Sequence, residues 1–265
     1  MVDRFGRNID YLRVSVTDRC NLRCSYCMPA DATFVPDEDR LTFDEIVEVV
    51  RLAVRHGVRK VRLTGGEPLL RPDVERLVGM LSRIEGIRDL AMSTNGTLLA
   101  DHAAALAAAG LGRVNVSIDA VRPEHYAERT GGGDVRRALS GIDAAVAAGL
   151  TPVKLNCVVR ESSAEPDARD VQTFARRHGL QVRFIRQMDL ATGSFGVVEG
   201  GSGGDCTQCT RLRLLSNGIL KPCLFSDLAF SVRRLGAARA IEQAINHKPQ
   251  RGTRCTDTWM YAIGG

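Results

Sequence analysis

The chain has 265 residues, of which 44% are hydrophobic and 25% charged, which suits one large domain or one domain with an appendage. No stretch approaches the ~18 apolar residues that a membrane span needs, and the first ten residues are too polar for a secretory signal, so we expect a cytoplasmic protein without a membrane partner. The net charge of +5 suits a phosphate-bearing ligand as readily as nucleic acid, and because the basic residues are scattered along the chain it does not decide between them. We expect a small-molecule substrate and no nucleic-acid partner.

Short β-rich runs alternate with longer segments of helical periodicity over the first part of the chain. We predict strands over residues 11–16, 60–63, 89–92, 113–117, 152–158 and 182–185. We predict helices over residues 42–55, 72–84, 97–109, 135–148 and 166–178. The first helix opens with Thr42 and Glu45, which form a capping-box pattern. Strand–helix repeats of this kind imply an α/β fold whose parallel sheet has right-handed crossovers, and we expect it to curl into an incomplete barrel.

The alternation stops after the sixth predicted strand. Residues 193–204 (GSFGVVEGGSGG) are rich in glycine and carry no sustained period, which predicts a loop or linker. We therefore divide the chain into a barrel over residues 1–189, a glycine-rich linker over 190–205 and a C-terminal region over 206–265. In the last region a hairpin is expected around Ser216-Asn217-Gly218, with a helix near residues 236–245.

Eight cysteines are many for a cytoplasmic chain, where disulfides are disfavoured, and six of them form two groups. Cys20, Cys24 and Cys27 follow the first predicted strand directly, at the sheet edge where active-site loops gather. Three thiolates at this spacing can hold an iron–sulfur cube and leave its fourth iron open to another ligand. A zinc site is the structural alternative, but it needs a fourth protein ligand, and no Cys or His lies close by in the sequence.

The second group is Cys206, Cys209 and Cys223, with Arg211 and Arg213 between them. Alternate residues of a strand point the same way, so the two arginines share one face. This is either a solvated strand face or a pair of guanidinium groups that grip phosphate or a reaction intermediate beside a cluster. The remaining cysteines, which we expect to be inert thiols, are Cys157 and Cys255.

Three further loops follow predicted strands at the same edge. Gly65-Gly66-Glu67-Pro68 permits close backbone approach and offers a carboxylate to an ammonium group, although alone it indicates a turn whose acid caps a helix. The loops Ser93-Thr94-Asn95-Gly96 and Ser117-Ile118-Asp119 either bind ribose hydroxyls or cap the following helices. Because all these loops leave one rim, we expect them to form a single pocket with the first cysteine group.

Cys20-x3-Cys24-x2-Cys27, with Tyr26 inside it and Gly-Gly-Glu-Pro after it, resembles the radical S-adenosylmethionine (SAM) superfamily. The chain resembles still more closely the GTP 3′,8-cyclase family of molybdenum cofactor (molybdopterin) biosynthesis. The segments that carry this resemblance are FGRNIDYLRVSVTDRCNLRCSYCMP, VRLTGGEPLLRPD, MSTNGTLL, RVNVSIDAV, VKLNCVV, VRFI, CTQCTRLRLLSNGILKPCLF and the terminal Gly264-Gly265. Relative to that family the chain resembles a shortened form, lacking residues between Met188 and Cys206 and after Phe225.

The resemblance implies a partial (βα)6 TIM-like barrel and a lyase with two [4Fe-4S] clusters. In such an enzyme an electron enters the first cluster, and SAM is cleaved to methionine and a 5′-deoxyadenosyl radical. That radical takes hydrogen from C3′ of GTP, and the resulting carbon radical adds to C8. Reduction of the cyclised radical then gives 3′,8-cyclo-7,8-dihydro-GTP, while the second cluster orients the base. The resemblance also implies an external flavodoxin-like or ferredoxin-like electron donor, and it leaves open a monomer or a homodimer.

The same resemblance assigns ligand contacts, with one cluster on each cysteine trio. The residues implied to touch SAM are Tyr26, Gly66, Ser117 and Met188, to which the loop argument above adds Gly65 and Glu67. The residues implied to hold GTP are Arg13, Lys60, Arg62, Ser93, Lys154, Arg183, Arg211 and Arg213, the last two also being the catalytic candidates. Several of these cations lie in predicted strands of an apolar barrel, where an inward charge needs a counter-ion such as a triphosphate. Outward snorkelling is the alternative.

Two other interpretations remain open. One is a related radical enzyme that acts on another nucleotide or on a peptide, and the other is a non-catalytic metal-binding protein that holds zinc. The terminal Gly264-Gly265 resembles the family's tail, which reaches into the pocket, the alternative being a frayed chain end.

Overall fold

The protein is described by a computed structural model over residues 1–29, 31–258 and 260–263. Its strands are β1 (Tyr11–Ser15), β2 (Lys60–Thr64), β3 (Asp89–Thr94), β4 (Arg113–Ser117), β5 (Lys154–Val159), β6 (Gln181–Arg186), β7 (Arg211–Leu214), β8 (Ile219–Lys221) and β9 (Phe230–Ser231). They form one nine-stranded sheet in the order β6-β5-β4-β3-β2-β1-β7-β8-β9. Strands β1 to β6 pair in parallel, and all six correspond to strands predicted from the sequence. The predicted α/β fold with a partial TIM-like barrel is confirmed.

The strands of the C-terminal region continue this sheet. Strand β7 pairs in parallel with β1, and β8 and β9 follow in antiparallel order. The predicted hairpin around Asn217 is the β7–β8 connection. Strand β1 therefore lies inside the sheet with a neighbour on each side. The second cysteine group flanks the β7–β8 hairpin, with Cys206 and Cys209 before β7 and Cys223 after β8.

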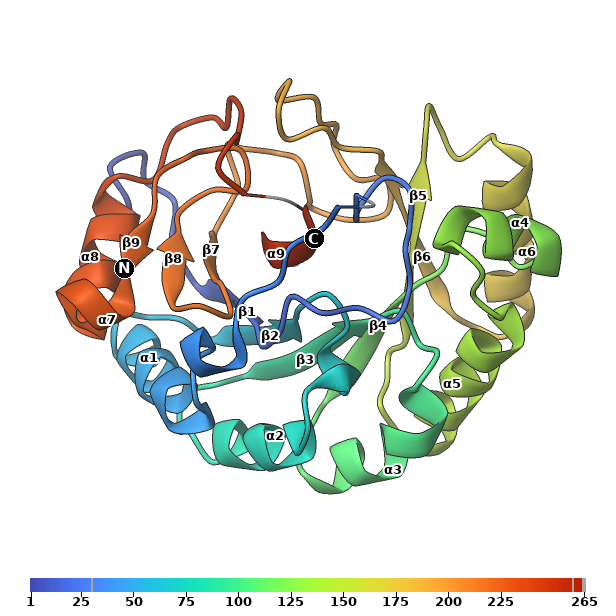
Figure 1. Ribbon diagram of the computed structural model, residues 1–265, viewed down its shortest axis with the longest axis horizontal. Coiled ribbons are helices and arrows are strands. Elements are labelled where there is room, and N and C mark those ends of the chain that lie inside the picture. The colour runs from blue at the N-terminus through green and yellow to red at the C-terminus, as the bar shows by residue number, and fades with distance from the viewer. Residues whose placement is uncertain (30, 259, 264–265) are drawn as a thin grey trace.

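The helices are α1 (Phe43–Arg55), α2 (Val74–Ser82), α3 (Leu99–Ala108), α4 (Pro123–Thr130), α5 (Val135–Ala147), α6 (Pro166–Arg177), α7 (Val232–Leu235), α8 (Ala237–Asn246) and α9 (Met260–Ile263), with short 3-10 turns at Asp37–Asp39 and Pro68–Leu70. Helices α1, α2, α3, α5 and α6 lie on the outer, convex side of the curved sheet, while α9 lies within its arc (Figure 1). Helix α4 was not predicted, because its eight residues are mostly polar and bury only Tyr126 and Thr130.

The two faces of the sheet differ sharply in polarity. Outward residues such as Leu12 and Val14 of β1 are buried in the main apolar core against the helices. The residues between them point the other way, because side chains alternate along a strand. These inward residues of β1 are Tyr11, Arg13 and Ser15, and similarly polar residues occupy the inner positions of the neighbouring strands. The inside of the arc is therefore a polar surface.

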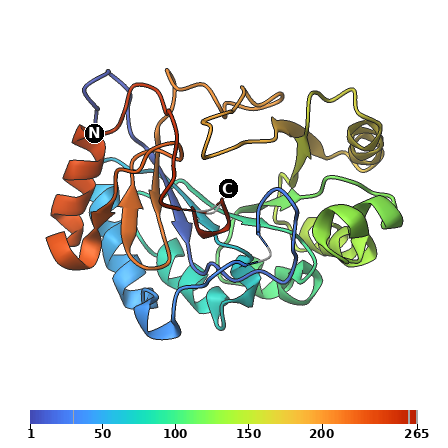
Figure 2. The same cartoon turned by 45° about the horizontal axis from the view of Figure 1, so that its top comes forward.

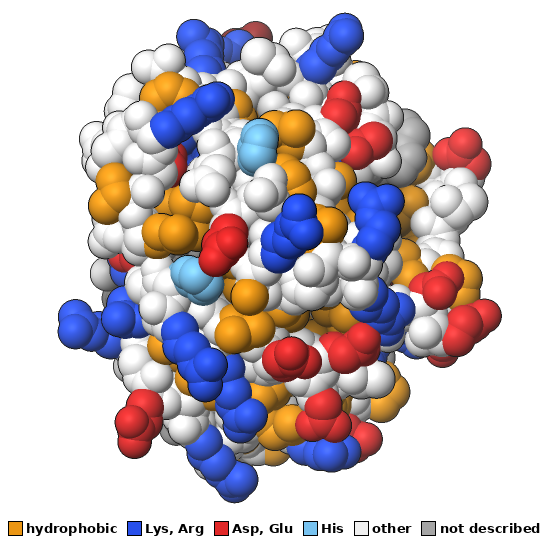
Figure 3. Space-filling model, turned by 90° about the vertical axis from the view of Figure 1, so that its left-hand side faces the viewer, with side chains coloured by type: hydrophobic (Ala, Val, Ile, Leu, Met, Phe, Trp, Pro, Cys, Tyr) orange, Lys and Arg blue, Asp and Glu red, His pale blue; other side chains and the backbone are white. Residues whose placement is uncertain are grey.

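The glycine-rich segment after β6 packs along that strand. A single bridge joins Phe184 of β6 to Glu199, and a second, local one joins Asp189 to Ser194, so the predicted loop is attached to β6 through Glu199. None of the helices in the described ranges is both long and apolar enough to cross a membrane. On the face drawn in Figure 3, Lys and Arg side chains are interspersed with acidic and apolar ones. The terminal pair Gly264-Gly265 lies outside the described residues.

Candidate active site

The loop after β2 is attached directly to the segment that leads into the first cysteine group. The backbone N–H groups of Gly66 and Glu67 donate to the carbonyls of Thr17 and Arg19, both at 2.8 Å. A Cβ atom on Gly66 would lie 2.4 Å from the Arg19 oxygen, closer than any side chain tolerates. The sequence suggested glycine for approach to a ligand. In the structure this glycine already permits two loops to meet, which fixes the start of the cysteine loop.

The first cysteine trio is close enough in space for its thiols to interact electrostatically. Its members are Cys20, Cys24 and Cys27. Burial, then Asp119 and the thiols of Cys27 and Cys20, raise the pKa of Cys24 to about 12. Burial, then Cys20 and Asp119, raise the pKa of Cys27 to about 12. The N–H groups of Cys27 and Met28 both donate to the Cys24 carbonyl at 3.0 Å, so a tight turn holds the last two thiols together. A multivalent metal centre supplies the positive charge that three such thiolates need, and the site fits an iron–sulfur cluster.

The spacing of the sulfurs separates a cluster from a single ion. Ligands around one zinc at about 2.3 Å lie roughly 3.8 Å apart. Neither cysteine trio, all of whose members are described, brings its three sulfurs within 4.8 Å of one another. All eight cysteines are free thiols. This arrangement argues against zinc at both trios.

Glu67 is fully buried, and its carboxylate is taken up by the protein itself. It accepts hydrogen bonds from the Thr94 hydroxyl at 2.7 Å, from the Asn95 N–H at 2.7 Å and from the Leu69 N–H at 3.1 Å. Burial outweighs these bonds and raises the pKa of Glu67 to about 7. The expected contact with an ammonium group is replaced here by a tie between the ends of β2 and β3, because no part of the side chain reaches a ligand surface.

Tyr26, inside the cysteine loop, reaches across to the ends of β4 and β5. Its hydroxyl donates to Asp119 Oδ2 at 2.6 Å, and Oδ1 of the same carboxylate accepts from the Val158 N–H at 2.7 Å. The cysteine loop is thereby held at the rim formed by these strands. Ser117 is exposed at the end of β4, at the same rim.

A row of arginines crosses three neighbouring strands on the inner face. Arg13 of β1 is the register partner of Arg62 of β2 and of Arg213 of β7. All three are buried, with 8%, 7% and 9% of their surface exposed. Burial and the nearby Arg213 and Arg211 lower the pKa of Arg13 to about 10, and burial with Arg13 among its neighbours does the same to Arg62. Like charges crowded in this way are stabilised by a polyanion.

The row lines a cavity of about 350 Å³. Its other cationic walls are Lys60, Arg113, Arg183 and Arg211, and all three cysteines of the second group open onto it together with Met188. The structure thus brings together most of the cations predicted to hold a nucleotide and the second cysteine group. Lys60, although it lines the cavity, is half exposed and pairs with Asp10 at 3.0 Å.

Other predicted residues lie outside the cavity lining. Ser93 and Lys154 are both partly buried in inner-face strands, and the Ser93 Oγ atom is buried without a hydrogen-bond partner. Burial and Arg183 lower the pKa of Lys154, so its ammonium belongs to the same field of positive charge. The predicted SAM residues other than Met188 lie around the first cysteine loop, away from the cavity lining.

The second trio has a different electrostatic setting from the first. Burial alone would raise the pKa of Cys209, but Lys248, Arg211 and Arg213 outweigh it and the pKa is lowered. Burial raises the pKa of Cys223. The first trio is therefore close to the carboxylate of Asp119, whereas the second lies among cations.

Sequence reasoning missed several inward residues of the same face. Tyr11 lines the cavity, and the guanidinium groups of Arg62 and Arg211 lie 5.5 and 5.8 Å from its ring centroid. Asp89 and Arg113 form a bidentate pair on the cavity wall. The signal was present in the sequence, since Tyr11 is two residues from Arg13 on a predicted strand and must share its face.

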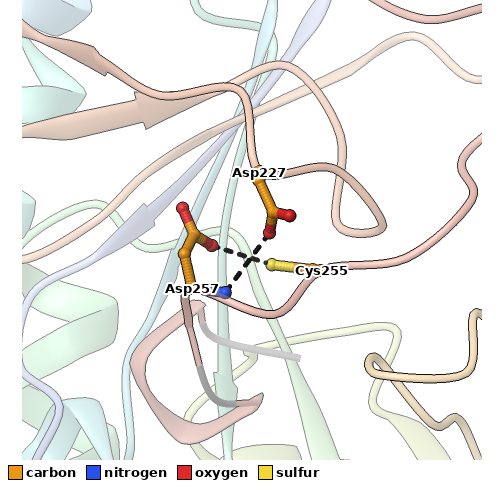
Figure 4. A group of neighbouring side chains, drawn as sticks. All are labelled: Asp227, Cys255 and Asp257. Carbon is orange, nitrogen blue, oxygen red and sulfur yellow. Dashed lines mark hydrogen bonds between the residues drawn. The ribbon is translucent and has the colours of Figure 1, made fainter.

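A second group of possible metal ligands is Asp227, Cys255 and Asp257, drawn in Figure 4. Its atoms already have partners. The fully buried Lys221 ammonium lies 2.7 Å from Asp257 Oδ1, and the Cys255 thiol donates to the same oxygen at 3.1 Å. Asp227 accepts from the N–H of Thr256 at 2.7 Å. The Lys221 ammonium already supplies the positive charge that a metal ion would bring. We therefore interpret this group as a set of contacts that holds the segment before α9 in place.

Comparison with known proteins decides the family. Residues 14–165 match the family model described as the radical SAM superfamily. The chain is 36% identical over 301 aligned positions to the GTP 3′,8-cyclase of Listeria monocytogenes serovar 1/2a, covering 94% of this chain and 90% of the relative. The chain belongs to the radical SAM superfamily and, within it, to the GTP 3′,8-cyclase family. The predicted enzyme class and resemblance are confirmed.

Another GTP 3′,8-cyclase, from Alkaliphilus oremlandii, is 36% identical over 322 aligned positions and is covered completely, as is this chain. Since this chain has 265 residues, that relative has segments which this radical SAM protein lacks. Among solved structures, Streptococcus suis SuiB bound to S-adenosylmethionine matches with a TM-score of 0.58 at 17% identity, covering 71% of this chain and 43% of that one. The native anSMEcpe structure with bound AdoMet matches with a TM-score of 0.55 at 18% identity, covering 70% and 54%. These two support the fold.

Membership of the radical SAM superfamily implies one [4Fe-4S] cluster and SAM. The first trio fits this cluster, because its three partly buried thiols lie within one another's electrostatic reach and, in the described chain, they belong to no group of ligand atoms packed tightly enough to enclose a single ion. A three-thiolate site leaves one iron for an outside ligand.

Proposed function

We propose that this protein converts GTP to 3′,8-cyclo-7,8-dihydro-GTP in molybdenum cofactor biosynthesis. The observation that carries the proposal is the buried row of Arg62, Arg13 and Arg213, which lines one cavity with Cys206, Cys209 and Cys223. A ligand that fills this cavity contacts both the arginine row and the three cysteines. This suits a nucleoside triphosphate, whose phosphates would meet the arginines and whose base would meet the metal centre. The names of the relatives support the same substrate.

At the rim, we assign the first cluster to Cys20, Cys24 and Cys27. The residues that we assign to SAM are Tyr26, Gly65, Gly66, Ser117 and Met188, while the enclosed Glu67 fixes the loop that carries the two glycines. When bound, this pair of cofactors supplies reductive cleavage of the sulfonium to a carbon radical. The protein's part is to hold the cysteine loop at a fixed position, through Tyr26 on Asp119 and through the Gly66 loop on residues 17–19.

In the cavity, the nucleotide is assigned to inward cations and to one hydroxyl. These residues are Arg13, Lys60, Arg62, Ser93, Lys154, Arg183, Arg211 and Arg213. Because the buried guanidinium groups lower one another's pKa, a bound triphosphate relieves their repulsion and gains affinity from it. Planar guanidinium groups also fix the orientation of phosphate oxygens by paired hydrogen bonds. Arg211 and Arg213 lie nearest the second trio in sequence and are our catalytic candidates.

A second [4Fe-4S] cluster is assigned to Cys206, Cys209 and Cys223. Three ligands again leave one iron for an outside group, and we assign that position to the guanine base. We also propose that residues 1–189 serve the SAM chemistry and residues 206–265 the second cluster, with a flavodoxin-like or ferredoxin-like protein as electron donor in the cytoplasm.

The decisive experiment measures 5′-deoxyadenosine formed by the reconstituted, dithionite-reduced protein with GTP, ATP, UTP or a peptide. The proposal predicts a yield that depends on GTP and a cyclised GTP product. A yield that depends on ATP or on peptide would instead support a related radical enzyme, and zinc without iron would exclude both.

Arg211→Ala supplies the residue-level test. It should abolish the cyclised product while 5′-deoxyadenosine still forms, because Arg211 lies in the cavity and not at the first trio. Arg136→Ala is the matched control, since Arg136 is a surface arginine that pairs locally with Asp134 at 3.0 Å. This control should retain product formation.

A further inference from the structure

Lys248, just after α8, is a buried lysine outside the assigned machinery. Only 1% of it is exposed. Its ammonium donates to the carbonyl of Arg211 at 2.7 Å and to the carbonyl of Pro222 at 2.6 Å. Arg211 lies two residues after Cys209, and Pro222 immediately precedes Cys223. One ammonium group therefore ties together the two chain segments that carry these cysteines.

Arg7 does the same for the third cysteine. Its guanidinium donates to the carbonyl of Cys206 at 2.8 Å and to the carbonyls of Pro249 and Gln250 at 2.8 and 3.1 Å. Asp3 holds it in place through a buried ion pair at 2.7 Å. The N-terminal segment lies beside α8 in both Figure 1 and Figure 2, so Arg7 and Lys248 reach the trio from adjoining segments.

The charge on Lys248 has a specific complement. Two neutral carbonyls only partly replace the water that a buried ammonium loses. The two carbonyls belong to Arg211 and Pro222, within two positions of Cys209 and Cys223, so the ammonium lies close to both of these cysteines. An apolar side chain of similar length would fill the same space without this penalty. The lysine charge is therefore matched to negative sulfur ligands on its neighbours.

We propose that Lys248 and Arg7 are positioning residues of the second cysteine trio, which they hold in the geometry that binds a cluster. Lys248 also places a positive charge beside that cluster. The inference rests on the proposed second cluster. Neither residue lines the cavity, so neither is assigned a contact with the nucleotide.

The test uses the full chain with Cys20→Ala, Cys24→Ala and Cys27→Ala, so that iron reports on the second trio alone. This background should bind about four irons and four sulfides per chain after anaerobic reconstitution. Lys248→Met and Arg7→Met in this background should lose iron to a chelator about tenfold faster, as is usual when a group that orients a metal ligand is removed. If the background binds no cluster, the second-cluster assignment fails, and this inference fails with it.

Lys221→Met is the matched control. Lys221 is fully buried at the end of β8, two residues before Cys223. Its ammonium bonds the Asp257 carboxylate at 2.7 Å and not a carbonyl beside a cysteine. If Lys221→Met releases iron as fast as Lys248→Met does, the effect is general loosening and the inference is wrong while the second cluster stands.

Two further measurements separate positioning from misfolding. In a chain with Cys206→Ala, Cys209→Ala and Cys223→Ala, Lys248→Met should leave about four irons on the first trio. Loss of that iron would show global unfolding and overturn the inference. In the first background, Lys248→Met should shift the reduction potential of the remaining cluster to a more negative value, because a neighbouring positive charge favours the added electron. An unchanged potential would contradict the charge role.

Discussion

Arg13 and Arg213 are direct register partners across the parallel pairing of β1 with β7, and both are more than nine-tenths buried. Two adjacent guanidinium groups on one face repel each other unless a ligand or neighbouring group offsets their charge. Arg62 extends the row on the other side of Arg13. Burial, and then Arg213 and Arg211, lower the pKa of Arg13, so these charges oppose one another in the nucleotide-free protein, and the next prediction follows from this opposition.

Arg13→Met should weaken GTP binding at least about tenfold, because one charge-assisted contact is lost. The same change should raise the unfolding midpoint of the nucleotide-free protein by about 2–4 °C, because it relieves the crowding of like charges. Equilibrium dialysis with GTP and calorimetry measure the two effects. A lower midpoint together with unchanged GTP affinity would contradict this account of the row.

Gly66→Ala should disrupt the cysteine loop, because the new Cβ would lie 2.4 Å from the Arg19 carbonyl oxygen. We expect a loss of about 1–3 kcal/mol in the free energy of unfolding and poor retention of the first cluster. Gly79→Ala is the control, since the nearest atom outside its own helix would lie 4.0 Å away. That change should stabilise α2 by about 0.5–1 kcal/mol. Urea unfolding followed by circular dichroism checks both.

Glu45 gives a prediction for acid stability. The hydrogen bond from Arg233, assisted by those from Thr42, lowers the pKa of Glu45 to about 2 from 4.5. A carboxyl whose pKa is lowered on folding stabilises the folded state above its unfolded pKa, and this contribution is lost as the pH falls from about 4.5 towards 2. Glu45→Gln should flatten the decline of stability in that window.

The control for this measurement is Glu48→Gln, on the exposed side of the same helix. The free energy of unfolding at pH 7 and at pH 3, from urea titrations, gives the comparison. Equal pH dependence in the two variants would show that the bond between α1 and Arg233 of α7 contributes nothing.

Cys24→Ala should halve the iron content, from about eight to about four per reconstituted chain, and abolish cleavage of SAM. The matched variant is Cys157→Ala, which removes a buried thiol that lies outside both trios. It should retain all the iron. Iron analysis and chromatography of 5′-deoxyadenosine provide the readout, and turnover that survives in Cys24→Ala would refute the assignment of the first trio.

The sequence predicts the barrel well, because each strand is a short β-rich run between glycine-closed helices. It predicts less well how the barrel and the C-terminal region pair with each other. The pairing of β1 with β7 joins Arg13 to Arg213 across 200 residues, and no local period indicates such a contact. Helix α4 escaped prediction because its sequence is polar and short.

The candidate site divides in the same way. The cysteine spacings and the cations on alternate strand positions are local patterns, so they can be identified from the sequence. Glu67 was expected at a ligand, yet three internal hydrogen bonds enclose it, a result of loop closure that spacing does not encode. Lys248 follows a helix in an ordinary turn, and only the folded chain places its ammonium on the carbonyls of Arg211 and Pro222.

Strand β1 has two faces: Tyr11 and Arg13 point into the cavity, and Leu12 and Val14 point into the apolar core. This alternation limits how the strand can change in length. Deleting a single residue within it would exchange the two faces on one side of the deletion, turning aliphatic side chains inward or the Arg13 guanidinium into the apolar layer under the helices. Deleting two would keep each set on its own side. We therefore expect β1 to tolerate insertions and deletions of two residues, and not of one.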